Sequence, residues 1–158
     1  MSRETHLLSI IICAYNERRT IADAIQQARD VDLGPSWRHE VIVVDNASTD
    51  GTRERLQSMD LPGVRVVYHD RNRGKSASIL TGIGEARGDY FAIFDADLEY
   101  EADDLARLTA AVNPEHTVAV FGSRTLGGRR IYEYAENYWG VRLLTWLANR
   151  FFGGNLTD

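Results

Sequence analysis

The chain has 158 residues, of which 44% are hydrophobic and 26% are charged, and its formal net charge at pH 7 is -5. This length favours one domain with a substantial core, and this composition is typical of a globular protein rather than a disordered one. The acidic balance disfavours a general nucleic-acid-binding protein, because a phosphate backbone requires a basic surface.

Cysteine content and hydropathy limit where the protein works. The single cysteine, Cys13, excludes an internal disulfide and offers too little sulfur for a thiolate zinc site, which fits a reducing cytosol. The apolar run LLSIIICAY is expected to be a first strand rather than a signal peptide. No apolar run approaches the roughly 20 residues that span a bilayer. We therefore expect a cytoplasmic protein, which could attach peripherally to the cytoplasmic face of a membrane.

Hydrophobic periodicity predicts an alternation of strands and helices. Runs rich in Val, Ile, Tyr and Phe predict five strands, at residues 7–13, 40–45, 64–69, 90–95 and 117–122. Helical patterns lie at residues 17–30, 51–59, 74–87, 101–112 and 138–152, and the third is expected to stop at Gly88. This alternation predicts an α/β fold with a mainly parallel sheet and helices on both faces.

Every predicted strand is followed by polar or charged residues. In chain order these segments are CAYNE, DNASTDG, HDRNRGKS, DADLEYE and GSR. In a parallel sheet they meet beyond the carboxyl ends of the strands, where ligands bind. Because a purely structural sheet would need only generic turns there, we expect a functional site at this edge.

The acidic stretch after the fourth strand predicts a cation site. Successive strand residues alternate faces, so Asp95 and Asp97 point to the same side of an extended strand. With Glu99 as a third oxygen donor, this pattern suits Mg²⁺ or Mn²⁺ bound together with a substrate diphosphate. The alternative is the start of a helix, since acidic residues favour first turns.

Two further acids are ligand candidates with structural alternatives. Asp45 ends a buried strand, so its carboxylate requires a hydrogen-bond partner, either a nucleobase edge or the backbone of the turn at residues 46–50. Residues 48–50 are expected to be turn and cap residues. Glu17 could accept hydrogen bonds from ribose hydroxyls, or it could be a first-turn acid.

Two basic residues are candidates for binding an anion. Lys75, the only lysine, lies in NRGKS, but this segment has His69 where a phosphate-binding P-loop requires glycine, which excludes that class of NTPase. The segment GIGEARG lies in a predicted helix and is not a dinucleotide fingerprint. Lys75 at a helix N-terminus can meet an anion, a carboxylate or solvent. Arg124 follows the fifth strand, where a guanidinium can hold a diphosphate at two points. The four histidines are expected to be surface or packing residues.

Taken in order, CAYNE, VVDNASTDGT, NRGKS, DADLEY and GSR resemble family 2 of the inverting nucleotide-sugar glycosyltransferases, over nearly the whole chain. The segments DADLEYEADDLARL, GSRTLGG and LLTWLANRFFGGNLTD are similar to its branch of dolichyl-phosphate and polyprenyl-phosphate mannose or glucose synthases. The resemblance implies a GT-A (Rossmann-like) fold and a UDP- or GDP-sugar donor. It also implies a Mg²⁺ or Mn²⁺ ion and transfer with inversion to a polyprenyl phosphate at the membrane surface.

The resemblance also implies roles for individual residues. It places Ala14, Tyr15 and Glu17 at the base and ribose, Asp45 at the base, Asp95 and Ala96 beside the nucleotide, Asp97 and Glu99 on the metal, and Arg124 at the phosphates. The candidates are then Asp97 and Arg124 for catalysis; Ala14, Tyr15, Glu17, Asp45, Lys75, Asp95 and Ala96 for nucleotide-sugar binding; and Asp95, Asp97 and Glu99 for the metal. An acceptor phosphate is already anionic, so a strong general base would be unnecessary.

The sequence departs from the family pattern at three positions. Cys13 stands where Pro is frequent, Asn46 where Asp is frequent, and Glu99 where related synthases have Gln, which leaves an oxygen donor in place. The family usually continues past Asp158, so we expect an excised or truncated domain in which acceptor binding is incomplete.

The expected domain organisation is one domain in two parts. Residues 1–131 form the nucleotide-sugar-binding core, and residues 132–158 form a helical tail that begins the acceptor-side segment. The tail alternates Trp, Leu and Phe with Arg, which suits either a lipid interface or packing on the sheet. The tail or an exposed sheet edge could also pair two copies.

Other functions stay open at this point. One is a donor-binding module without turnover, which needs a missing segment or partner, and another is a family 2 transferase that acts on a saccharide hydroxyl. A sugar nucleotidyltransferase is disfavoured, because CAYNERR lacks the Gly- and Arg-rich loop expected after the first strand of that class.

Overall fold

The computed structural model describes residues 5–98, 100–122, 135–153 and 156–157. The chain divides into two compact units, Met1–Glu115 and His116–Asp158. The boundary expected after residue 131 lies outside the described residues and stays a prediction.

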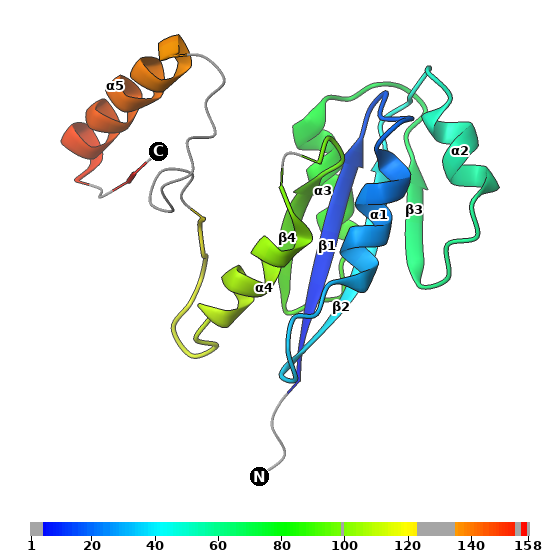
Figure 1. The fold of residues 1–158 in the computed structure, drawn as a ribbon, viewed down its shortest axis with the longest axis horizontal. Coiled ribbons are helices and arrows are strands. Elements are labelled where there is room, and N and C mark those ends of the chain that lie inside the picture. The colour runs from blue at the N-terminus through cyan, green and yellow to red at the C-terminus, as the bar shows by residue number, and fades with distance from the viewer. Residues whose placement is uncertain (1–4, 99, 123–134, 154–155, 158) are drawn as a thin grey trace. The chain divides into compact units, whose positions relative to one another are not determined.

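The first unit is built on a parallel sheet of four strands (Figure 1). The strands are β1 (His6–Ala14), β2 (Trp37–Asp45), β3 (Val64–Tyr68) and β4 (Tyr90–Asp95), in the spatial order β3-β2-β1-β4. In this register Ala14 lies beside Asp45, and Cys13 lies beside Asp95. Parallel pairing therefore brings the four strand exits to one edge of the sheet, as predicted.

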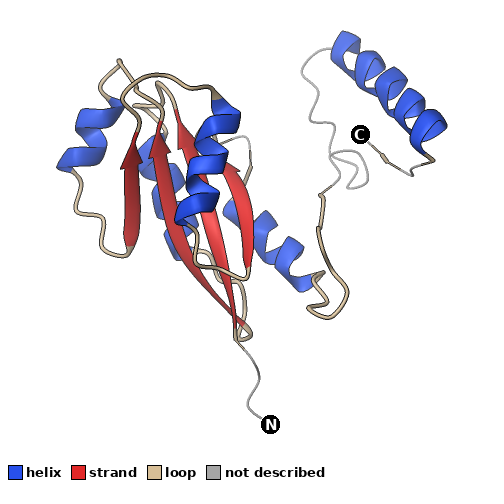
Figure 2. Cartoon of the chain, turned by 180° about the vertical axis from the view of Figure 1, so that it is seen from behind, coloured by secondary structure: helices blue, strands red, loops and turns tan. Residues whose placement is uncertain are grey.

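Helices cover both faces of this sheet (Figure 2). They are α1 (Ile21–Asp30), α2 (Thr52–Ser58), α3 (Lys75–Glu85) and α4 (Ala102–Ala110). On β1, Ile10 and Ile12 pack in the buried cluster that includes residues of α1 and α4, whereas Ile11 lies against Gly82 of α3. Because neighbouring strand residues point to opposite faces, α1 and α4 cover one face and α3 covers the other. The predicted α/β architecture is confirmed.

The predicted fifth strand is wrong. Residues 117–122 form no strand and belong to the second unit, where Val118 and Phe121 are 97% and 89% exposed. Valine and phenylalanine favour strands, but a strand is stable only when a neighbour binds its backbone groups and its side chains are packed. Residue composition alone could not show that, in the part of the chain that the structure describes, no neighbouring strand pairs with residues 117–122.

The third helix also ends earlier than predicted. It stops at Glu85, so Gly88 is not its C-terminal residue. A Cβ atom at Gly88 would lie 2.6 Å from the carbonyl oxygen of Leu7 and 2.7 Å from Oγ of Ser9. The glycine is therefore required by the close approach of the α3–β4 loop to β1 rather than by a helix end.

A polar cluster anchors the α3–β4 loop. Oε1 of Glu40 accepts hydrogen bonds from the Ser9 hydroxyl (2.8 Å) and the Arg87 backbone N–H (2.7 Å), and Oε2 lies 3.3 Å from Nη2 of Arg65. The Gly88 N–H donates to Oγ of Ser9 at 2.9 Å. Burial alone would raise the pKa of Glu40, but the bonds from Arg87 and Ser9 and the charge of Arg65 outweigh it and hold the pKa below its ordinary value.

We expect Glu40→Gln to lower the free energy of unfolding at pH 7 by about 1 kcal/mol, because the charge-assisted bonds are weakened. A carboxylate with a depressed pKa stabilises the fold above its unfolded-state pKa and loses that contribution as the pH falls through its folded-state pKa. The stability difference between natural chain and variant should therefore shrink below pH 4.5, the ordinary value. Urea denaturation at several pH values measures it, and a difference independent of pH would contradict this account.

The second unit contains α5 (Ala135–Phe152), which confirms the predicted tail helix. Its exposed apolar side chains are Trp139, Leu143, Leu144, Trp146, Phe151 and Phe152. Over the part of the chain that the structure describes, no helix combines the length and the apolar character that a bilayer crossing requires.

Candidate functional site

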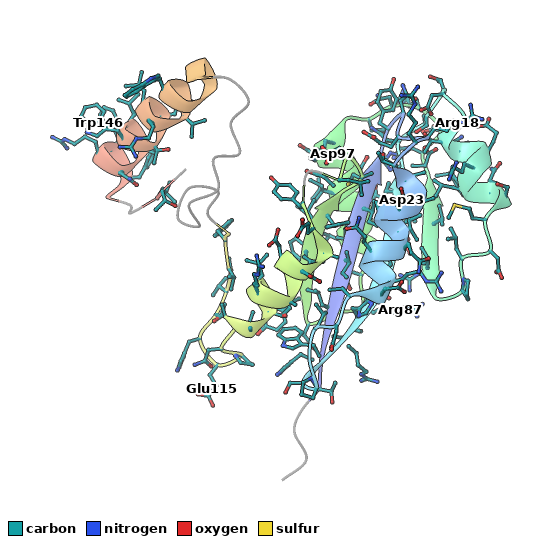
Figure 3. The ribbon with its side chains drawn as sticks, viewed as in Figure 1. Arg18, Asp23, Arg87, Asp97, Glu115 and Trp146 are labelled. Atoms are coloured by element: carbon teal, nitrogen blue, oxygen red, sulfur yellow. The ribbon has the colours of Figure 1, made fainter. Side chains whose placement is uncertain are left out.

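A cavity lies at the carboxyl ends of β1, β2 and β4. It is lined by the strand exits and the first turn of α3, through Cys13, Ala14, Tyr15, Glu17, Asn46, Asn72, Gly74, Lys75, Ser78, Asp95, Ala96 and Asp97. Figure 3 shows Asp97 and Arg18 at this end of the sheet and Arg87 nearer its other end. Most predicted site residues are thus brought together, but Asp45 does not line the cavity. Glu99 and Arg124 lie outside the described residues.

Asp45 is fully buried, and its partners come from the protein. Its Oδ2 forms an ion pair with Nε of Arg53 at 2.7 Å, and its Oδ1 accepts a hydrogen bond from the Ser48 N–H at 3.2 Å. The alternative in which the following turn satisfies Asp45 is therefore present in this structure, together with an ion pair that the sequence did not reveal. A contact with a nucleobase stays a prediction, and it requires this buried carboxylate to become accessible.

The loop after β1 is fastened to the loop after β2. Asn16 adopts a left-handed φ of 61°, its N–H donates to Oγ of Ser48 (3.0 Å), and its Oδ1 accepts from the Thr49 N–H (2.8 Å). The Glu17 N–H donates to Oγ1 of Thr52 at 2.9 Å. Residues 48 and 49 lie in the loop between β2 and α2 and hold the β1 exit in place. The N-cap residue of α2 is Gly51 and not one of residues 48–50, although Oδ1 of Asp50 accepts a hydrogen bond from the Thr52 N–H at 3.0 Å.

Glu17 faces the cavity and is not a first-turn acid, because α1 begins only at Ile21. Its Oε2 accepts a hydrogen bond from the Thr20 hydroxyl at 3.0 Å. Tyr15, which is 45% exposed, lines the same wall. A carboxylate that can accept hydrogen bonds from hydroxyl groups and an exposed aromatic ring that can stack are therefore available on the same wall.

A directional hydrogen-bond network supports the opposite wall. Oδ1 of Asn46 accepts bonds from Nδ1 of the buried His69 and from the Arg73 N–H, both at 2.9 Å. Nδ1 donates to this oxygen, because an amide oxygen can only accept, and Nε2 lies 2.9 Å from Oγ1 of Thr81. Nδ2 of Asn46 donates to Oδ1 of Asn72 at 3.0 Å. His69 is a packing residue, as predicted, and it orients Asn46.

The role of Asn46 was missed from sequence. The signal was its position directly after Asp45 at a strand exit, where we weighed it only as a departure from a family pattern. We expect Asn46→Ala to destabilise the fold by about 1–3 kcal/mol, because His69 and the Arg73 N–H lose a buried acceptor. Hydrogen exchange of the Arg73 and Gly74 amides should accelerate, since the Gly74 N–H donates to Oδ1 of Asn72, which Asn46 holds.

Asn46→Asp is the matched control for this prediction. It keeps the acceptor oxygen but loses the donor to Asn72, so the Arg73 amide should stay protected while the Gly74 amide exchanges faster. If the Arg73 and Gly74 amides exchange at the same rates in Asn46→Ala and in Asn46→Asp, the hydrogen bonds of Asn46 do not hold the loop that precedes α3.

Three non-glycine residues near the strand exits have a left-handed backbone. They are Asn16 (φ 61°), Ala47 (φ 60°) and Leu98 (φ 63°), after β1, β2 and β4 respectively. This conformation costs about 1–2 kcal/mol for residues such as Ala47 and Leu98, whereas asparagine adopts it more readily. Strain of this kind is concentrated at functional edges, where the surrounding structure enforces it.

The charged part of the cavity centres on Asp95. Its Oδ1 lies 2.7 Å from Nζ of Lys75, the first residue of α3. The hydrogen bond to Asp95 raises the pKa of Lys75, and the charges of Asp95 and Asp97 add to this effect against partial burial. Burial raises the pKa of Cys13 to about 11, so this neighbouring group is a neutral thiol at pH 7 and does not supply a thiolate.

Asp95 and Asp97 fit a divalent cation better than a helix start. The helix start belongs to other acids, because α4 begins at Ala102 with Asp103 and Asp104 in its first turn. Asp95 and Asp97 line the cavity, and carboxylates are ligands that Mg²⁺ and Mn²⁺ prefer. Among the described residues, which do not include Glu99, no three His, Cys, Asp or Glu side chains form a metal cluster.

Comparison with known proteins identifies the family. The model of the family described as Glycosyl transferase family 2 matches residues 9–158. The chain belongs to glycosyl transferase family 2.

Three relatives are similar to this chain in sequence. A dolichol-phosphate mannosyltransferase of Pyrococcus furiosus is 30% identical over 78% of this chain and 35% of its own length. An undecaprenyl-phosphate 4-deoxy-4-formamido-L-arabinose transferase of Pseudomonas fluorescens is 28% identical over 97% of this chain and 44% of its own. The succinoglycan biosynthesis protein ExoO of Rhizobium meliloti is 36% identical over 82% of this chain and 37% of its own. The chain therefore spans less than half the length of these relatives.

A solved mannosyltransferase structure confirms the fold. The mannosyltransferase PcManGT from Pyrobaculum calidifontis, in complex with GDP-Man and Mn²⁺, has a TM-score of 0.55 and 29% identity, over 70% of this chain and 33% of that chain. The fold is GT-A (Rossmann-like), as the resemblance implied.

Proposed function

We propose that this chain binds a UDP- or GDP-sugar together with Mg²⁺ or Mn²⁺, and that the whole protein transfers the hexose with inversion to a polyprenyl phosphate. The observation that carries the proposal is the convergence of Asp95, Asp97 and Lys75 with Tyr15 and Glu17 on one cavity at the strand exits. The acceptor class is supported by two relatives, one named as a dolichol-phosphate transferase and the other as an undecaprenyl-phosphate transferase.

The roles of the residues follow from their chemistry. Tyr15 and Glu17 receive the base and ribose, the first by ring stacking and the second by accepting hydroxyl hydrogen bonds. Asp95 and Asp97 hold the cation, and Lys75 binds a donor phosphate. Two further roles in this proposal come from the sequence alone: Glu99 is a third metal ligand, and Arg124 binds the diphosphate.

Transfer of this kind depends on position and charge. A bound divalent cation supplies Lewis-acid stabilisation of the leaving diphosphate. Lys75 brings a further positive charge to the donor phosphates. The residues that follow β1 and β2 hold the nucleoside in one position, and this position sets the direction from which the acceptor attacks the sugar. A phosphate acceptor arrives as an anion, so no residue need remove a proton from it.

The test is a thermal-shift panel of UDP-, GDP- and TDP-sugars, each with Mg²⁺, Mn²⁺ or EDTA, followed by transfer to a short polyprenyl phosphate. We expect one nucleotide to raise the melting temperature only when a divalent cation is present, and the released nucleoside diphosphate to match the glycolipid formed. Equal shifts with metal and with EDTA would contradict the metal-dependent donor site.

Two alternatives have specific support. The chain spans only 35% to 44% of the three relatives described, which favours a donor-binding module whose acceptor site needs a further segment. Donor binding without transfer, restored in a longer chain, would select it. ExoO is named for succinoglycan biosynthesis, which favours an acceptor that offers a saccharide hydroxyl. Transfer to a glycan and not to a lipid phosphate would select that function.

We further propose that the protein works at the cytoplasmic face of the membrane. A polyprenyl acceptor is confined to a bilayer, and α5 exposes Trp146 and Leu143 beside Arg142, a composition suited to a lipid interface.

A further inference from the structure

Lys75 and Asp95 form the ion pair that links the two sides of the proposed donor site. Asp95 is the last residue of β4, Lys75 is the first residue of α3, and both line the cavity. The side chains differ in exposure, since that of Asp95 is 22% exposed and that of Lys75 is 60% exposed. The carboxylate is therefore fixed in the floor of the site, whereas the ammonium stands at its solvent side.

The ammonium of Lys75 competes with any divalent cation for this carboxylate. Its Nζ lies 2.7 Å from Oδ1 of Asp95, which is hydrogen-bond contact. Two cations on one carboxylate repel each other, and the repulsion is strong in a partly buried site, where water screens it poorly. A divalent ion that binds Asp95 must therefore displace the ammonium or bind less tightly.

We propose that Lys75 is an exchangeable counter-cation of the donor site. It neutralises Asp95 before a divalent cation binds, and it is released on metal binding to hold a phosphate of the nucleotide donor. This inference rests on the proposed function, because it uses the same cation and the same donor.

The local structure allows this exchange without refolding. The backbone before Lys75 is fixed, because the Gly74 N–H donates to Oδ1 of Asn72, which also accepts a bond from Asn46. The four-carbon stem of Lys75 is flexible and mostly exposed, so Nζ can leave Asp95 while the helix start stays in place. A released ammonium stays at the N-terminus of α3, where the helix dipole favours an anion such as phosphate.

The exchange predicts coupling between the two ligands. Metal binding frees Lys75 for the nucleotide, and a nucleotide that holds Lys75 keeps it away from Asp95. Each ligand should therefore raise the affinity of the other by the same factor, as thermodynamic linkage requires. Removal of Lys75 should strengthen metal binding and weaken nucleotide binding, whereas a lysine with a merely structural role would not change the two affinities in opposite directions.

The first experiment uses the fact that Lys75 is the only lysine in the chain. Protein labelled with ¹³C-lysine gives a single side-chain Cε signal by NMR, which reports the state of this group. We expect Mg²⁺ alone to shift this signal, Asp95→Asn to shift it similarly without metal, and UDP or GDP to shift it again when Mg²⁺ is present. A signal that does not move while calorimetry shows Mg²⁺ bound would overturn the exchange.

The second experiment measures affinities by calorimetry. We expect Lys75→Gln to tighten Mg²⁺ binding by about fivefold and to weaken UDP or GDP binding at saturating Mg²⁺ by about tenfold, the scale of one partly exposed ion pair or one charged contact. Arg107→Gln is the matched control, since Arg107 pairs with Asp104 on α4 and does not line the cavity, and it should change neither affinity.

The outcomes separate the two proposals. Metal-dependent nucleotide binding with an unchanged Mg²⁺ affinity in Lys75→Gln would overturn the exchange and leave the donor site intact. If the natural chain binds UDP or GDP equally well with and without Mg²⁺, both the proposed function and the exchange are wrong.

Discussion

We expect Asp97→Asn to abolish the metal-dependent gain in UDP or GDP affinity, which should be at least about tenfold in the natural chain, or roughly 1.4 kcal/mol. The change keeps the size of the side chain and removes its charge, so a cation in the cavity loses one of the two carboxylates, Asp95 and Asp97, that are proposed to hold it. In a protein that carries out transfer, kcat/KM should fall by about 100-fold to 1,000-fold, as when one electrostatic group is removed from a transition state.

Calorimetry of each nucleotide with Mn²⁺ and with EDTA measures this effect. Asp103→Asn is the matched control, because Asp103 belongs to the same acidic stretch but lies exposed in the first turn of α4. That variant should keep the metal dependence. If the two variants behave alike, the acidic stretch is only a helix start with a general surface charge, and the cation site is wrong.

We expect Gly82→Ala to lower the free energy of unfolding by about 2 kcal/mol, through overpacking in the core. A Cβ atom at this position would lie 2.4 Å from Cγ2 of Ile11, which is fully buried at the centre of β1. The helix must move away from the sheet to relieve this contact. Because α3 begins with Lys75 and lines the cavity, nucleotide affinity should fall as well.

Gly84→Ala provides the control within the same helix. No heavy atom lies within 4 Å of a Cβ built at Gly84, so alanine should stabilise the chain by about 0.5–1 kcal/mol through helix propensity. Urea denaturation compares the variants. The double variant Gly82→Ala/Ile11→Ala should cost less than the sum of its single changes, since the methyl group that clashes is removed. If the free-energy changes of the two single variants simply add in the double variant, the contact with Ile11 is not the cause of the destabilisation by Gly82→Ala.

Much of the fold could be predicted because it depends on local patterns. The run IIIC in β1 is apolar at every position, since the strand is central and buried on both faces, and this distinguishes it from an amphipathic edge strand. The helices were recognised by spacing, with Ile21, Ala24, Ile25 and Ala28 of α1 all buried. The failure at residues 117–122 has the opposite cause, because a strand needs partners that lie elsewhere in the chain.

The candidate site could be predicted only in part, for a related reason. Strand exits that carry Tyr15, Glu17, Asp95 and Asp97 are visible as polar segments after apolar runs, and parallel topology alone brings them together. The partner of a buried polar atom is not visible in this way. The sequence predicts that the Asp45 carboxylate binds either a ligand or the backbone of the following turn. In the structure it accepts a hydrogen bond from that turn and also forms an ion pair with Arg53, eight residues later.

The sequence alone determined the α/β alternation, the position of the site at the strand exits and the acids that face the site. Each of these depends on residues that lie close together in the chain. The tertiary structure decided which charges meet. The pairing of Lys75 with Asp95, the network of His69 with Asn46 and the contact of Gly82 with Ile11 join segments that are far apart in sequence. Hydrogen bonds and repulsive contacts act over a few ångströms in space, so no local pattern records them before the chain has folded.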